Sequence, residues 1–208
     1  MTALVSTYTE EGFIAGADSL RLDLRGQVVT ESATKLFATE HRDFMGAYGW
    51  AGTTGLEYID GRPALNVLDC ACRITTELRQ CQFSSAQEFV EDFCQRLTDF
   101  IARASLGIAL PDPKSGTEFL RGMFVGYHRN RPFLLQTAFS VSNGYLQSPQ
   151  LTQLVEAPND FCIASGSAVV WDELRQEGVS QPSALAEGTT LVKDYVARCI
   201  KNDTDPHC

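Results

Sequence analysis

The strongest constraint on the fold is a β-hairpin pattern at the start of the chain. Residues 3–9 are rich in Leu, Val, Thr and Tyr, which are typical of a pleated, half-buried strand. Glu10-Glu11-Gly12 indicates a tight turn, and a second apolar run over residues 13–17 follows it and ends at Asp18. The chain is therefore expected to begin with two antiparallel strands.

The later elements are predicted from apolar spacing. The expected strands are short apolar runs, and they cover residues 28–30, 34–38, 44–51, 118–127, 132–141 and 161–164. The expected helices have apolar residues at spacings of three and four, and they cover residues 65–78, 85–104, a segment that starts near 165, and 184–202. Ser85 and Glu88 have the spacing of a capping box, and Arg129-Asn130-Arg131 is expected to be a hairpin turn.

This order of elements favours an α+β fold. Strands and helices do not alternate as they do in a doubly wound parallel sheet. Two antiparallel sheets need covers on their outer faces, and two helix pairs can supply them. We therefore expect a four-layer αββα sandwich of two antiparallel sheets flanked by helix pairs. Residues 1–208 should form a single domain, because 44% hydrophobic content supports a sizeable core and no linker or repeat divides the chain.

Charge and hydropathy exclude some partners. The formal net charge of −9 argues against a general nucleic-acid binder, because phosphate affinity comes from clustered Lys and Arg. No apolar run is long enough to span a bilayer, so no membrane association is expected. The N-terminus also lacks the pattern of a secretory signal, which favours a cytoplasmic location.

The cysteines and histidines give weak functional signals. Seven cysteines are an odd number, so they cannot form a complete disulfide framework, and most are expected to be buried small hydrophobes. Cys70 and Cys72 are too close for the usual zinc pair, so neither a metal site nor a cofactor is expected. His41, His128 and His207 fall in predicted turns or at the terminus, which argues against a histidine-based triad.

Thr2 is the candidate nucleophile. A hydroxyl needs a base, and the α-amine of an N-terminal Thr can supply one once Met1 is removed. A buried Lys35 would orient that hydroxyl, and Asp18 would hold the Lys in place. Other interpretations remain open: Thr2 is an ordinary strand residue, Asp18 caps a turn, Lys35 is solvated, and Ser165 caps a helix.

The chain resembles the proteasome β-subunit family and its bacterial relatives, the Thr peptidases of the N-terminal-nucleophile hydrolase class. The similar segments are Thr2, Gly12 to Ser19, Thr34-Lys35-Leu36-Phe37, Ala51-Gly52 and Ala164-Ser165-Gly166-Ser167. The resemblance implies that Gly52 contributes an oxyanion-hole amide and that Ser165 lies beside the nucleophile. It also implies that Asp205 is a late catalytic Asp and that Arg21, Ala33 and Trp50 line a substrate pocket.

The function implied is a threonine peptidase, an endopeptidase, in a self-compartmentalising assembly. Such a protein would be a homo-oligomeric ring or a similar assembly that cleaves peptides or unfolded proteins and is fed by an ATP-dependent unfoldase. The family usually continues with a turn and two strands after the last helix, so the chain ending at Cys208 is expected to lack C-terminal strands.

Two other functions remain open. One is a non-catalytic assembly subunit, which retention of Met1 would favour, because Thr2 then has no free amine. The other is an amidohydrolase of the same superfamily that acts on a small amide.

Overall fold

The computed structural model divides the chain into two compact units. Unit 1 comprises Met1–Leu36 and Val155–Cys208, and unit 2 comprises Phe37–Leu154. That residues 1–208 form a single domain stays a prediction. The structure describes residues 3–19, 21–22, 28–30, 33–41, 44–58, 60–104, 118–142, 145–155, 161–165 and 168–203.

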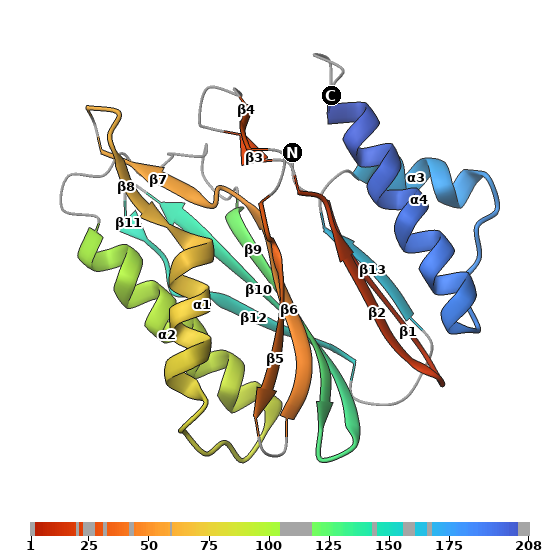
Figure 1. The fold of residues 1–208 in the computed structure, drawn as a ribbon, viewed down its shortest axis with the longest axis horizontal. Coiled ribbons are helices and arrows are strands. Elements are labelled where there is room, and N and C mark those ends of the chain that lie inside the picture. Colours follow the sequence, from red (N-terminus) through yellow and green to blue (C-terminus); the bar gives the residue numbers. More distant parts are fainter. Residues whose placement is uncertain are drawn as a thin grey trace. The chain divides into compact units, whose positions relative to one another are not determined.

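Unit 1 is built on a three-stranded antiparallel sheet in the order β13-β1-β2 (Figure 1). β1 (Leu4–Thr9) and β2 (Gly12–Ala17) form the expected hairpin, in which Thr9 pairs with Gly12. β13 (Phe161–Ser165) pairs with the other side of β1, which confirms the strand expected at 161–164 and makes β1 central. A separate two-stranded ribbon joins β3 (Arg21–Leu22) to β4 (Val28–Thr30).

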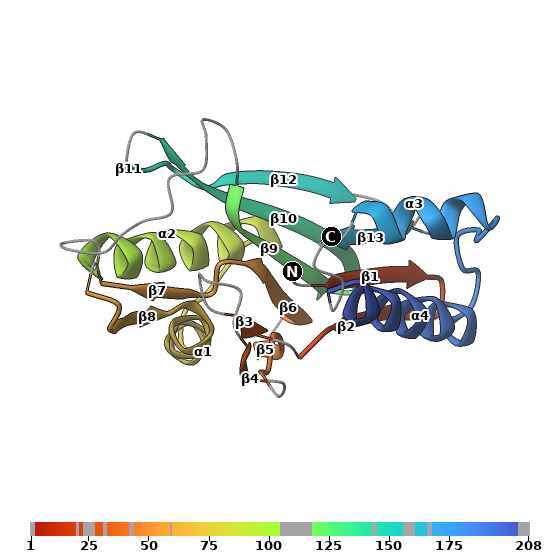
Figure 2. The same ribbon diagram turned by 90° about the horizontal axis from the view of Figure 1, so that it is seen from above.

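Two helices belong to unit 1, and they confirm the last expected helix pair. α3 is Ala168–Gln176 and α4 is Leu185–Asp203. α4 runs along β1 and β2, and α3 lies beside α4 and β13 (Figure 2). The core of this unit joins one face of β1 to both helices. Its buried members are Ala3, Val5, Val170, Leu174, Leu191, Val192, Tyr195 and Cys199.

Glycines allow α4 to lie very close to the hairpin. A Cβ added at Gly16 would lie 2.4 Å from Cγ1 of Val192, and one added at Gly188 would lie 2.8 Å from Cγ2 of Thr7. Both distances are below any that real Cβ atoms tolerate. The absence of these two side chains therefore fixes how near the helix sits to β1 and β2.

Gly16→Ala is expected to lower the free energy of unfolding by about 1–3 kcal/mol, because the new methyl overpacks the contact with Val192. Chemical denaturation measures the change. Combining Gly16→Ala with Val192→Ala removes the clashing methyl group, so the two changes together should cost less than the sum of their separate effects. Parental stability for Gly16→Ala would contradict the close approach of α4 to β2.

Unit 2 contains a six-stranded antiparallel sheet. Its main path is β11-β10-β9-β6-β5, and β12 also pairs with β10. Arg129 and Asn130 have φ values of 50° and 65° between β9 and β10, which confirms the expected hairpin turn. The strands are β5 (Leu36–His41), β6 (Phe44–Gly52), β9 (Glu118–His128), β10 (Arg131–Ser142), β11 (Tyr145–Leu146) and β12 (Gln150–Val155).

Two helices, α1 (Val67–Leu78) and α2 (Ala86–Ala104), cover one face of this sheet (Figure 1). Both were expected from the sequence. The core between sheet and helices is rich in aromatic rings, including Tyr48, Trp50 and Phe124. The Tyr48 hydroxyl donates to the carbonyl of Ala71, and burial raises the pKa of Tyr48 to about 12.

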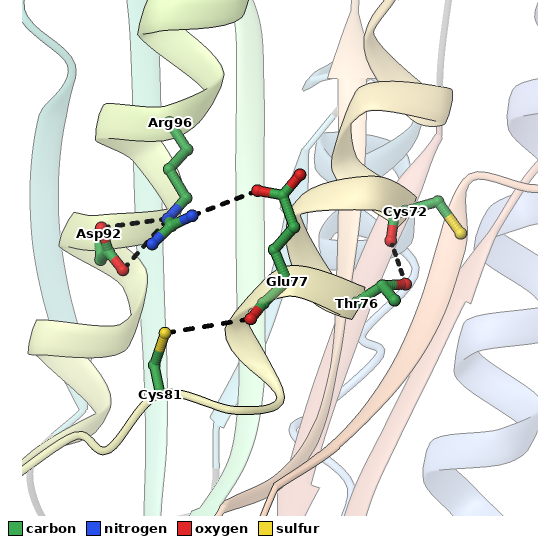
Figure 3. A network of polar contacts seen from close by, with 6 residues as sticks. All are labelled: Cys72, Thr76, Glu77, Cys81, Asp92 and Arg96. Carbon is green, nitrogen blue, oxygen red and sulfur yellow. Dashed lines mark hydrogen bonds and ion pairs between the residues drawn. The ribbon is translucent and has the colours of Figure 1, made fainter.

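Polar contacts join the two helices on their outer side. Figure 3 shows Arg96 of α2 contacting Asp92 on its own helix and Glu77 of α1, with Arg96 Nη1 lying 3.2 Å from the Glu77 carboxylate. The Ser85 hydroxyl accepts a hydrogen bond from the Glu88 N–H at 3.1 Å, as the capping box predicts. The Glu88 carboxylate, however, accepts from Ser84 and not from Ser85.

Several pieces of unit 2 differ from the expectations, and one of them is β5, which covers Leu36–His41 instead of the expected residues 34–38. β7 (Gly55–Glu57) and β8 (Pro63–Asn66) form a short hairpin, and β8 covers the first residues of the helix expected at 65–78. Asn66 instead caps α1, because its side chain accepts from the Leu68 N–H. The pairings of β11 and β12 were also not expected. In the described residues, no helix is long and apolar enough to cross a membrane.

Candidate active site

The candidate site is centred on an ion pair between two buried side chains of unit 1. Lys35 Nζ donates to Asp18 Oδ1 at 2.7 Å, and each side chain is 1% exposed. A charge removed from water in this way is very unfavourable unless it is paired and hydrogen-bonded. Asp18 and Lys35 are thus buried together, as the sequence led us to expect, while their catalytic roles stay predictions.

Backbone hydrogen bonds bring this pair to the start of β1. The Asp18 N–H donates to the carbonyl of Ala3 at 3.1 Å, which continues the β1–β2 ladder by one step. The Ala33 N–H donates to the carbonyl of Ser19 at 2.9 Å, and this holds the segment that carries Lys35 beside the end of β2. Asp18 therefore lies opposite Ala3, the residue that follows Thr2 in the sequence.

Ser165 lies at the same end of β1, on its other side. It is the last residue of β13 and pairs with Leu4, while Leu4 pairs with Ala17 of β2 on the opposite side. The two neighbouring strands thus place Asp18 and the Ser165 backbone at either side of the β1 start. The Ser165 side chain lies outside the described residues.

A contact that the sequence did not reveal ties the hairpin to α4. Oε2 of Glu11, in the β1–β2 turn, accepts a hydrogen bond from the Leu185 N–H at 2.8 Å. Glu187 accepts from the Ser183 N–H at 2.9 Å, and this hydrogen bond lowers the pKa of Glu187. Carboxylates at a helix N-terminus satisfy its free amides and its dipole. The turn of the hairpin and the start of α4 therefore support one another.

Gly52 is the last residue of β6, in unit 2. Its φ is 102°, and a Cβ there would lie 2.4 Å from the carbonyl oxygen of Phe119. The Thr53 N–H donates to the same carbonyl at 2.7 Å. A side chain is therefore disfavoured at Gly52 for both conformational and steric reasons. Its role in an oxyanion hole stays a prediction.

Trp50 lies in the core of unit 2. Its side chain is 0% exposed and packs against Phe93, Phe124 and Phe139. Gly122 makes room for it, because a Cβ there would lie 2.6 Å from the indole ring. The structure thus places Trp50 as a core residue, and the substrate-pocket role assigned to it by resemblance stays a prediction.

The other expected site residues are described in part or not at all. Ala33 is partly buried. Arg21 is in β3, but its side chain lies outside the described part of the structure. Thr2 and Asp205 lie outside the described residues. Within the described ranges, no group of three or more His, Cys, Asp or Glu could hold a metal ion.

Comparison with known proteins supports the fold. A scan against protein-family models and a search of curated proteins each gave no match. The fold is similar to that of a mutant of Anbu from Hyphomicrobium sp. strain MC1, a bacterial proteasome-like N-terminal-nucleophile hydrolase. The TM-score is 0.60 at 13% sequence identity, and the match covers 95% of this chain and 75% of that one.

At this identity the likeness shows the fold alone. The described chain has an α+β fold with antiparallel sheets and four helices, similar to that of Anbu. The resemblance to the proteasome-like hydrolases that the sequence motifs indicated is confirmed at the level of the fold.

Proposed function

We propose that this chain is a threonine peptidase whose nucleophile is Thr2, exposed by removal of Met1. The observation that carries the proposal is the buried Asp18–Lys35 ion pair beside Ala3. A charged pair with 1% exposed side chains contributes little to stability compared with well-packed apolar residues. Its presence is better explained by a task that needs a fixed positive charge next to the N-terminus.

The proposed chemistry proceeds through an ester. The Thr2 hydroxyl oxygen attacks the carbonyl carbon of the substrate, and its proton passes to the α-amine of Thr2. The C–N bond then breaks, the α-amine returns the proton to the leaving amine, and water hydrolyses the ester. The positive charge of Lys35 stabilises the negative charge that develops on the Thr2 oxygen as its proton leaves. By the resemblance to the proteasome β-subunit family, the Gly52 N–H is the donor that stabilises the oxyanion.

We also propose the finer fold class, a four-layer αββα sandwich of two antiparallel sheets flanked by helix pairs. Unit 1 contains a sheet that packs on α3 and α4, and unit 2 contains a sheet that packs on α1 and α2. Two sheets that each have one face covered by a helix pair are the components of such a sandwich.

The assembly and partners are part of the same proposal. An N-terminal nucleophile that cleaves peptide bonds needs confinement to be selective. We therefore propose a homo-oligomeric ring or related assembly, with peptides or unfolded proteins as substrates and an ATP-dependent unfoldase as partner.

Intact mass measurement followed by active-site labelling tests the function. The native protein is expected to lack Met1 and to gain the mass of one boronate or epoxyketone probe per chain, located at Thr2. Retention of Met1 in the native protein would instead support the non-catalytic subunit. A chain that lacks Met1 but takes up no probe would contradict the proposal. Hydrolysis of small amides but not of peptides would indicate the amidohydrolase.

A further inference from the structure

Unit 1 contains a cavity beside the C-terminal half of α3 and the residues that follow this helix. The cavity has a volume of about 130 Å³. Leu174 and Leu191, which belong to the core of the unit, form its apolar base, and Val179 and the indole of Trp171 add apolar walls. A cavity of this size class accommodates a molecule about as large as benzene.

The rim of the cavity is formed by the turn that ends α3. The Val179 N–H donates to the carbonyl of Leu174 at 3.0 Å, and the Gly178 N–H donates to that of Arg175 at 3.1 Å. With Gly178 at a φ of 82°, these two bonds form a Schellman motif. The motif holds Val179 next to Leu174, so this wall of the cavity is set by backbone hydrogen bonds.

A second contact fixes the same turn to α4. Arg198 makes two hydrogen bonds of 2.7 Å to the carboxylate of Glu177, and it also pairs with Asp194. Glu177 is therefore already neutralised and does not compete for Arg175. The cavity thus has a base and a rim that are both anchored in the fold before any ligand arrives.

Hydrogen-bond donors gather at the opening. The Arg175 guanidinium lies 5.6 Å from the centre of the Trp171 ring, and within the described part of the chain no carboxylate pairs with it. Ser180 and Gln181 line the same opening. An exposed guanidinium beside hydroxyl and amide groups, above an apolar base, is complementary to a carboxylate attached to an apolar body.

We propose that this cavity binds a small carboxylate with an aromatic or branched aliphatic body, with the carboxylate on Arg175 and the apolar body against Trp171. The carboxylate could come from a free organic acid or from the C-terminal residue of a peptide. The site is separate from the Asp18–Lys35 pair and does not depend on the proposed peptidase activity.

The two tryptophans provide a test by NMR. In ¹⁵N-labelled protein, phenylacetate is expected to shift the indole N–H signal of Trp171 saturably, while the signal of the buried Trp50 in unit 2 stays in place as an internal control. Arg175→Gln is expected to weaken the binding at least about tenfold, because a charge-assisted hydrogen bond is lost. Arg103→Gln, an exposed arginine on α2, is the matched control and should bind as the parent does.

The outcomes separate the alternatives. N-acetyl-glycyl-phenylalanine that binds more tightly than phenylacetate indicates a peptide C-terminus, and the reverse order indicates a free acid. Equal binding of phenylacetamide would overturn recognition of the carboxylate, and equal binding of acetate would overturn the role of the apolar base. No saturable shift of Trp171 at about 10 mM phenylacetate would overturn the site.

Discussion

Replacing Lys35 by Met is expected to lower the free energy of unfolding by about 3–5 kcal/mol. Met has an unbranched side chain that can follow the path of the Lys methylene groups, so little packing is lost. The carboxylate of Asp18 is 1% exposed, however, and it would lose the ammonium group that now lies 2.7 Å away. Urea denaturation at neutral pH measures the loss.

Two further variants test whether the unpaired charge, rather than a change in packing, causes the loss of stability. Combining Lys35→Met with Asp18→Asn removes both charges, so the double variant is expected to recover a large part of the lost stability. Arg62→Met breaks an ion pair with Asp60 whose side chains are 75% and 54% exposed, and it should change stability by less than about 1 kcal/mol. A similar small effect of Lys35→Met would contradict the burial of the pair.

Local patterns predicted most of the fold. The hairpin at residues 3–17 and the helices α2 and α4 have clear periodicity, because one face of each packs on a core. The Asp18–Lys35 pair could be inferred from position, since Asp18 ends an apolar strand and Lys35 sits within an apolar segment. Side chains in such places are buried, and buried charges are found in pairs.

The remaining features are contacts between residues that are far apart in the sequence, or elements that are too short to give a recognisable pattern. Glu11 and Leu185 are 174 residues apart, and nothing near either one in the sequence indicates their hydrogen bond. β7 and β8 have three and four residues, too few for periodicity, although Asp60-Gly61 between them is a turn signal that could have revealed the hairpin. The cavity beside Trp171 forms only after α3 and α4 pack, so residue spacing could not predict it.

Replacing Thr2 by Ala is expected to reduce kcat/KM for peptide hydrolysis by about 10³-fold or more, because the variant keeps an N-terminal amine but has no hydroxyl to attack the substrate. Initial rates on short fluorogenic peptides measure the effect. Thr2→Ser keeps the hydroxyl and the amine, so it should retain far more activity than Thr2→Ala. Both substitutions place a small residue after Met1, so Met1 removal should proceed in both, and intact mass verifies it.

Thr2→Ala and Lys35→Met are expected to differ in their effect on stability. Lys35→Met should lose both stability and activity, whereas Thr2→Ala should lose activity while its midpoint of urea denaturation stays close to that of the parent. Activity that survives in Thr2→Ala would move the nucleophile elsewhere or reveal a contaminating peptidase. Loss of activity in Thr2→Ser equal to that in Thr2→Ala, with Met1 absent from both, would also contradict a hydroxyl nucleophile, because both variants have the same free amine and differ only in the oxygen.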